Sequence, residues 1–102
     1  MFRFGEYTRL IKDFADKRTA AIFHGLVVKK MDRSLQEAAR VKLVILNNAM
    51  QVDDLRLPPS NRLEKLGGDR QGQWSFRVNR QWRIWLRWVD GDAFDVELVD
   101  YH

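Results

Sequence analysis

The chain has no cysteine, and only two histidines and two prolines among its 102 residues. Without cysteine there is no disulfide, no thiol nucleophile and no cysteine-based metal site, and two scattered histidines do not make a zinc site. We therefore expect no metal and no cofactor. No apolar run approaches the roughly 18 residues of a membrane span, and the first residues lack the apolar segment of a signal peptide. These features predict a cytoplasmic protein with no membrane partner.

The length of the chain allows one small core and therefore one domain. Residues 1–8 show no clear periodicity and are interpreted as an N-terminal extension, and residues 9–102 as a single domain. Four Trp, six Phe and two Tyr supply large side chains for the core. We expect a globular protein of α+β class, because a short strand pattern and two helical patterns are followed by a run of strand patterns.

The net charge of +4 is unevenly distributed along the sequence. Two acids, Glu64 and Asp69, stand in a segment that carries seven cations: Arg62, Lys65, Arg70, Arg77, Arg80, Arg83 and Arg87. Residues 90–100 contain five acids and no cation. A basic patch beside an acidic edge is typical of a nucleic-acid surface next to a separate partner surface, although an ordinary solvated surface of mixed charge gives the same composition.

Two helices are predicted in the first half of the chain. Residues 10–14 suit a short strand, and a helix is expected from Asp16 to His24, closed by Gly25. His24 is interpreted as a helix C-terminal residue. Ser34 and Glu37 form a capping-box pattern that predicts a second helix up to about Met50. One face of this helix is expected to be apolar: Leu35, Ala39, Leu43, Leu46 and Met50. Residues 58–61 (PPSN) then predict an irregular loop.

Side-chain parity fixes the register of a hairpin around Asn79. A three-residue turn over residues 79–81 places Val78 opposite Trp82, so that two apolar rows meet the core: Trp74, Phe76 and Val78, and Trp82, Ile84, Leu86 and Trp88. The other face then carries Ser75, Arg77, Arg83, Trp85 and Arg87. Arg77 and Arg83 face each other across this pair, which is unfavourable unless an anion lies between them or both side chains splay into water.

The last predicted strand alternates apolar and polar residues from Phe94 to Val99 and leads into Asp100, Tyr101 and His102. Its register is left open. We expect the strand to hold His102 in place, so that this end of the chain can contribute to a site; a frayed end is the alternative.

Four sequence blocks resemble the HigB toxins, or plasmid maintenance system killer proteins, of the RelE/ParE toxin superfamily. They are residues 61–75 (NRLEKLGGDRQGQWS), 81–84 (QWRI), 90–96 (DGDAFDV) and 99–102 (VDYH). The resemblance implies the RelE-like microbial RNase fold, a small twisted antiparallel β-sheet with two N-terminal helices packed on one face and a basic face left open for RNA. It also implies a type II toxin that cleaves mRNA on the ribosome, held silent by a HigA-type helix-turn-helix antitoxin that alone contacts operator DNA.

Two residues depart from the family pattern. HigB-like toxins often have histidine where this chain has Glu64, and lysine where it has Gly67. The related YoeB toxins place a glutamate general base at the position of Glu64. The substitution at Glu64 is thus one that the superfamily uses, whereas Gly67 leaves one expected cation missing.

The resemblance and the chemistry of RNA cleavage together suggest roles for the site residues. Attack by the 2′-hydroxyl needs a base, an acid and positive charge at the phosphate, for which Glu64, His102 and Arg83 are the candidates. Tyr101 could stack on a base or orient the phosphate, and Asp100 could orient His102 or cap the sheet edge. The candidate RNA-binding residues are Arg62, Lys65, Arg70, Arg77, Arg87 and Trp85, the tryptophan that parity places on the arginine face.

Each assignment has a structural alternative. Glu64 could form an ordinary surface ion pair, and Arg83 could be a solvent-facing strand residue. The competing functions are a ParE-like inhibitor of DNA gyrase, which shares the fold, and a non-catalytic module that binds RNA or an antitoxin.

Overall fold

The computed structural model describes residues 11–101. Residues 1–10 and 102 lie outside the described range, so the predictions for the extension over residues 1–8 and for His102 stay predictions. Two helices, α2 (Lys17–Phe23) and α3 (Arg33–Asn48), precede four strands: β1 (Glu64–Lys65), β2 (Gln73–Arg77), β3 (Trp82–Val89) and β4 (Asp92–Asp100). Three short 3-10 helices span Val52–Arg56, Pro59–Asn61 and Gly68–Arg70. Within the described range, no helix is long and apolar enough to cross a membrane.

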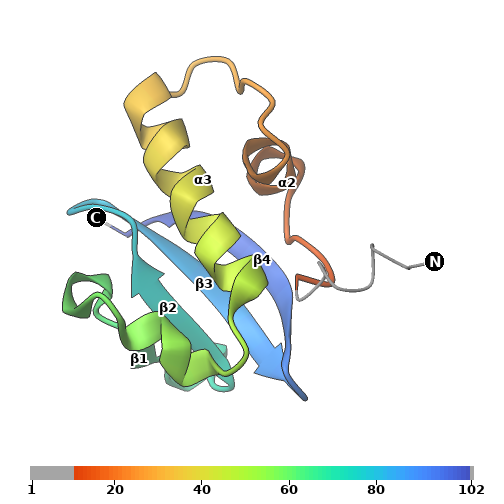
Figure 1. Cartoon of the computed structure of the whole chain (residues 1–102), viewed down its shortest axis with the longest axis vertical. Coiled ribbons are helices and arrows are strands. Elements are labelled where there is room, and N and C mark those ends of the chain that lie inside the picture. Colours follow the sequence, from red (N-terminus) through yellow and green to blue (C-terminus); the bar gives the residue numbers. More distant parts are fainter. Residues whose placement is uncertain (1–10, 102) are drawn as a thin grey trace.

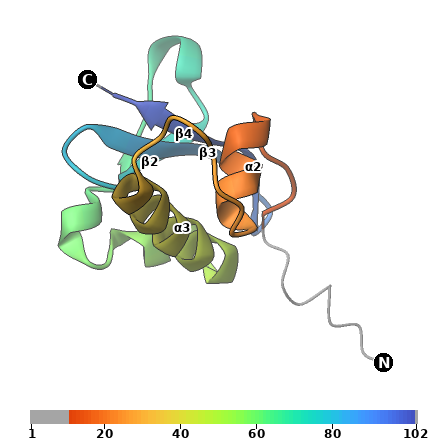
Figure 2. The same ribbon diagram turned by 90° about the horizontal axis from the view of Figure 1, so that it is seen from above.

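The strands form one antiparallel sheet in the order β1-β2-β3-β4, and both helices lie on the same face of it (Figures 1 and 2). The predicted α+β class and the two-helix layer are confirmed. The core lies between α3 and the central strands. Fully buried Leu43 and Leu46 of α3 belong to the same apolar cluster as Phe76, Ile84 and Leu86. Burial of these apolar faces is the main term that stabilises such a two-layer fold.

Helix α2 begins as predicted. The Asp16 side chain accepts a hydrogen bond from the Thr19 N–H at 2.7 Å, and Gly25, with φ of +81°, follows the C-terminal His24. The predicted strand over residues 10–14 is different. Its described part makes only single parallel bridges, Ile11 with Ala93 and Phe14 with Val96.

The cap of α3 is Asp32, and the predicted capping box at Ser34 is wrong. Asp32 Oδ2 accepts from the Leu35 N–H at 3.1 Å, while the Ser34 hydroxyl, inside the first turn, donates to the Asp32 carboxylate. The helix ends at Asn48, so Met50 is 77% exposed rather than on the core face. Asp32 lies two residues before Ser34, so the helix begins earlier than the capping-box pattern predicted.

The register of the β2–β3 hairpin is the predicted one. The Val78 N–H donates to the Trp82 carbonyl at 2.9 Å, and Arg77 is the cross-strand partner of Arg83. The apolar row faces the helices, with Phe76 and Ile84 fully buried. The clean alternation of apolar and polar residues on both strands is what makes this register readable from sequence.

Strand β4 carries a bulge at Asp95, whose φ is +54°. The pairing with β3 shifts by one residue there, between Trp85↔Glu97 and Arg87↔Phe94. The outward main-chain groups of β4 around the bulge are taken up by the chain that precedes and forms α2. Val96 N–H donates to the Asp13 carbonyl at 3.2 Å, and Leu98 N–H donates to the Thr19 hydroxyl at 3.0 Å.

Candidate functional site

The face of the sheet turned away from the helices carries the predicted polar row. Successive side chains of a strand point to opposite faces, and Ile84 points into the core, so Arg83 lies on this polar face. Glu64 joins this face because it pairs with Ser75, a member of the same row. Lys65 does not: it pairs with Trp74 on the helix face, and its Nζ lies 5.4 Å from the centre of the Trp74 ring. The structure therefore separates Lys65 from the other predicted site residues.

Arg83 is buried, with 7% of its surface exposed, so its interpretation as a solvent-facing strand residue is wrong. Its guanidinium is held on two sides. Nε donates to the Ser75 hydroxyl, and Nη2 donates to the main-chain carbonyls of Arg62 at 2.7 Å and Ser75 at 3.2 Å. A guanidinium with this many acceptors has a fixed orientation.

The anion nearest to Arg83 is Glu64. Arg83 Nη2 lies 3.4 Å from Glu64 Oε2. Burial lowers the pKa of Arg83, and the Glu64 carboxylate opposes this effect. Arg77 turns away instead, and its Nε donates to the Asn79 carbonyl at 3.0 Å. The two facing arginines thus coexist because one is paired with a carboxylate and the other bonds to the hairpin turn.

The loop before β1 is shaped by buried Asn61. Its amide donates to the carbonyls of Leu55 and Leu57, both at 3.1 Å, and its oxygen accepts from Lys42 of α3. The next residue, Arg62, has a left-handed backbone with φ of +46° and ψ of +57°. With this backbone, the Arg62 carbonyl accepts a hydrogen bond from Arg83. Glu64, two residues further along the chain, lies beside the same guanidinium.

A group of planar side chains extends from Arg83 across the open face. The Tyr101 ring centre lies 5.8 Å from Arg83 Cζ and 6.4 Å from the Trp85 ring, which it meets edge to face. On Trp85 lies the guanidinium of Arg70, with Cζ 4.6 Å from the ring centre. Arg70 and Tyr101, far apart in sequence, therefore contact the same tryptophan.

The remaining predicted residues have partners of their own. Asp100 accepts from Gln81 Nε2 at 3.1 and 3.3 Å, and the Tyr101 N–H donates to the Gln81 carbonyl at 2.8 Å. The end of β4 is thus tied to the hairpin turn. Arg87 Nε lies 3.3 Å from Asp95 Oδ2 at the bulge. Arg87 is on the open face, but part of its charge is already compensated.

Three contributors to this site were not assigned a role from sequence. Ser75 was placed on the correct face, but its buried hydroxyl was not recognised as an acceptor for Arg83. Asn61 lies inside the first resembling block, and its side chain is fully buried, yet neighbouring Pro58 and Pro59 suggested only a loop. Lys42 carries no sequence signal, because an exposed and a buried helix lysine look alike. Burial lowers the pKa of Lys42.

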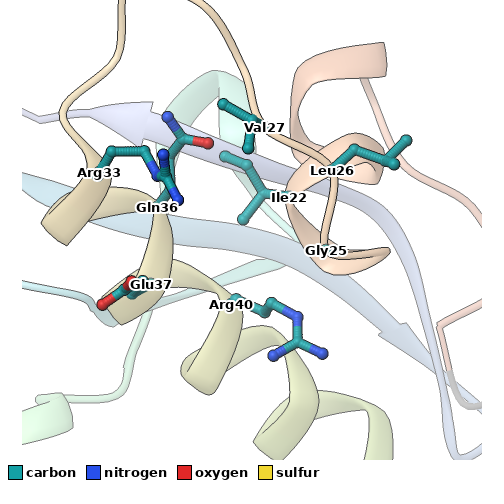
Figure 3. Close-up of a pocket in the computed structure, with 8 residues that line it drawn as sticks. All are labelled: Ile22, Gly25, Leu26, Val27, Arg33, Gln36, Glu37 and Arg40. Carbon is teal, nitrogen blue, oxygen red and sulfur yellow. The ribbon is translucent and has the colours of Figure 1, made fainter.

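A pocket of about 270 Å³ lies in the helical layer (Figure 3). It is on the opposite side of the sheet from the polar face that carries Glu64. Its lining comes from α2, α3 and the connection between them: Ile22, Gly25, Leu26, Val27, Arg33, Gln36, Glu37 and Arg40. Gln36 shapes it by bonding to Val28 N–H and to the Val28 and Met31 carbonyls. Between residues 11 and 101, no group of three acids or histidines is placed to hold a metal ion.

The α+β fold with an arginine-centred polar face is that of the RelE-like toxins. A family model described as "RelE-like toxin of type II toxin-antitoxin system HigB" matches residues 12–102, and the chain belongs to this family. Two relatives agree. The chain is 46% identical to Toxin HigB-1 of Vibrio cholerae over 65 residues, which cover 64% of this chain and 68% of the relative. The chain is 29% identical to Endoribonuclease HigB of Proteus vulgaris over 93 residues, which cover 91% of this chain and 100% of the relative. The resemblance to HigB toxins is confirmed.

Proposed function

We propose that the chain is an endoribonuclease toxin that cleaves mRNA on the ribosome. The observation that carries the proposal is the pair of Glu64 and Arg83 on the open face of the sheet, in a member of the HigB toxin family. The name of the Proteus vulgaris relative, Endoribonuclease HigB, supports the same reaction.

In the proposed reaction Glu64 takes the proton of the RNA 2′-hydroxyl. The 2′-oxygen attacks the adjacent phosphorus, and the bond from phosphorus to the 5′-oxygen breaks, which leaves a 2′,3′-cyclic phosphate. A base at this position must reach the RNA, and the Glu64 side chain is 53% exposed. The contact with Arg83 holds its carboxylate at one edge of the site.

Arg83 has two roles in this proposal. Ser75 and the Arg62 carbonyl fix its guanidinium, and Arg83 in turn orients Glu64. Among the described residues none accepts a hydrogen bond from Nη1, which is therefore available to an oxygen of the phosphate. A cation that is already oriented stabilises the developing negative charge without reorganisation.

His102 is the proposed acid that protonates the departing 5′-oxygen. It follows Tyr101 in the sequence, and the ring of Tyr101 lies beside Arg83. Asp100 is proposed to orient His102. The cations Arg62, Arg77 and Arg87 would hold the RNA backbone, and Arg70 would contact the RNA beside them. Trp85 and Tyr101 would form the aromatic part of this RNA-binding surface.

The proposed partner is a HigA-type helix-turn-helix antitoxin, since type II toxins act with a cognate antitoxin. Ribosome-bound mRNA is the proposed substrate. Operator DNA would be contacted only through the antitoxin.

Expression in growing cells, followed by mapping of mRNA ends, tests this function. We expect the chain to arrest growth and to produce new mRNA ends at codon-linked positions. The Glu64→Gln variant should do neither. DNA damage without new mRNA ends would indicate a gyrase inhibitor. Growth inhibition with neither outcome would indicate a non-catalytic binding module.

A further inference from the structure

Three planar side chains form a ledge on the open face of the sheet, which we define as Arg70, Trp85 and Tyr101. They come from three parts of the chain: the 3-10 helix Gly68–Arg70, strand β3 and the residue after β4. The loop that delivers Arg70 has positive φ at Gly68 (+57°) and Gly72 (+95°). Glycine adopts this backbone without strain, so the loop can fold back over the sheet.

The guanidinium of Arg70 lies over the ring of Trp85. Its Cζ is 4.6 Å from the centre of the indole, the geometry of a cation–π contact, and its Nη1 is 3.4 Å from Gln73 Oε1. Arg70 is an exposed residue, so RNA can reach its side chain from solvent.

The indole N–H of Trp85 does not explain why this residue lies on a polar face. Its Nε1 is buried and has no hydrogen-bond partner among residues 11–101. Because the indole N–H, the only donor of the side chain, has no acceptor among these residues, we assign the role of Trp85 to its ring. The ring supports Arg70 on one side and meets the edge of Tyr101, which is 56% exposed.

The ledge is continuous with the proposed cleavage site. Tyr101 contacts both Trp85 and Arg83, and Arg83 is paired with Glu64. A nucleotide next to the cleaved bond would therefore meet the ledge. Unpaired bases are recognised in proteins by stacking on aromatic rings or on arginine planes.

We propose that one unpaired base of the substrate RNA, next to the cleaved bond, stacks on the guanidinium of Arg70, with Trp85 as the support beneath it. The inference rests on the proposed RNA-cleaving function and adds the subsite that holds the base. Stacking needs only a planar partner, so this subsite accepts all four bases. Its contribution is to binding rather than to proton transfer.

Binding of a fluorescent single-stranded oligoribonucleotide tests the subsite, measured by anisotropy with the Glu64→Gln protein as the uncleaving parent. Arg70→Lys keeps the charge and removes the plane. We expect it to weaken binding about 5- to 150-fold, the range for loss of one stacked base. Arg33→Ala removes a cation from the pocket in the helical layer (Figure 3) and should leave binding unchanged.

The salt dependence separates stacking from a simple charge contact. Arg70→Lys should lower affinity without changing the slope of log affinity against log salt, because the number of cations is the same. If Arg70→Lys binds like the parent while Arg70→Ala does not, Arg70 is a phosphate contact and the proposal is overturned. Failure of the parent to bind also overturns it, since the ledge needs no ribosome.

Cleavage of ribosome-bound mRNA, measured beside the binding experiment, distinguishes the two proposals. If the unsubstituted chain leaves ribosome-bound mRNA uncut but the Arg70→Lys effect on binding is present, the cleavage mechanism fails and the subsite stands. If cleavage depends on Glu64 but Arg70→Lys changes neither binding nor KM, the subsite fails and the mechanism stands.

Discussion

Arg83 and Glu64 form an ion pair between a buried and an exposed side chain. Their Nη2 and Oε2 atoms are 3.4 Å apart, with 8% and 53% of the two side chains exposed. The arginine has three further acceptors from Ser75 and Arg62, and the glutamate has access to solvent. Substitutions at the two positions should therefore have different effects on stability.

Glu64→Gln should abolish most cleavage and leave the fold intact. The amide cannot take a proton, and loss of a positioned general base typically costs about 10²- to 10⁴-fold in rate. Arg83 keeps its other acceptors, so thermal unfolding should change little. The measurement is RNA cleavage at matched protein concentration. Glu37→Gln on α3 is the control, and equal losses in both variants would contradict the assignment.

Ser75→Ala should reduce stability and activity together. The Ser75 hydroxyl accepts from buried Arg83 Nε, and a buried donor left without an acceptor costs about 1–3 kcal/mol. A reoriented Arg83 would also hold Glu64 less well. Urea unfolding and cleavage should both be measured, with exposed Ser60→Ala as the control. Unchanged unfolding of Ser75→Ala would show that Arg83 finds another acceptor.

Gly67→Lys should increase cleavage. HigB-like toxins often carry lysine here, and a Cβ at Gly67 meets no atom within 4 Å. The backbone φ of −118° suits any residue, so no strain is expected. The added charge should act on the RNA backbone, and the gain should shrink as salt is raised. A rate that stays the same at low salt would mean that other cations already supply the charge.

Asn61→Ala should destabilise the loop that positions Arg62. The Asn61 side chain is fully buried; its amide donates to two main-chain carbonyls and its oxygen accepts from Lys42. Leaving such groups unpaired costs about 1–3 kcal/mol. Asn48→Ala, at the exposed end of α3, is the matched control for urea unfolding. A similar small effect at both positions would contradict the role given to Asn61.

Asp32→Ala should lower the unfolding temperature at neutral pH, and the difference from the unsubstituted chain should shrink in acid. The hydrogen bond from the Ser34 hydroxyl lowers the pKa of Asp32, and the bond from the Leu35 N–H adds to it. The stabilising effect is thus complete above the unfolded pKa of about 3.9 and is lost as pH falls through the lower folded value. Ser34→Ala should have a smaller effect, measured by thermal melts at several pH values.

The parts of the fold that were predicted correctly are those with a clean period. The hairpin register followed from alternation on two strands, and α2 followed from Asp16 and Gly25. The bulge at Asp95 could not be predicted, since only a small fraction of aspartates adopt a positive φ and the chain contains several of them. The start of α3 was predicted two residues too late, because Asp32 caps the helix and Ser34 lies within its first turn.

The candidate site was located from sequence, but its internal contacts were not. Parity and the resembling blocks brought Glu64, Arg83 and Tyr101 to one face. The burial of Arg83 depends on the Arg62 carbonyl, a main-chain atom in an irregular loop, and periodicity carries no information about such atoms. The same limit applies to Lys65, because β1 is only two residues long and its side could be assigned only from the observed pairing.

The outer edge of β4 has a consequence for how the toxin can associate. The outward main-chain groups of Val96 and Leu98 are bound by Asp13, Ala15, Arg18 and Thr19. An exposed strand edge is a template for strand addition and for aggregation, and here that template is occupied. A partner chain, including an antitoxin, could extend the sheet at this side only by first displacing residues 11–15 and the start of α2. Complex formation by burying side chains leaves these bonds intact and avoids that cost.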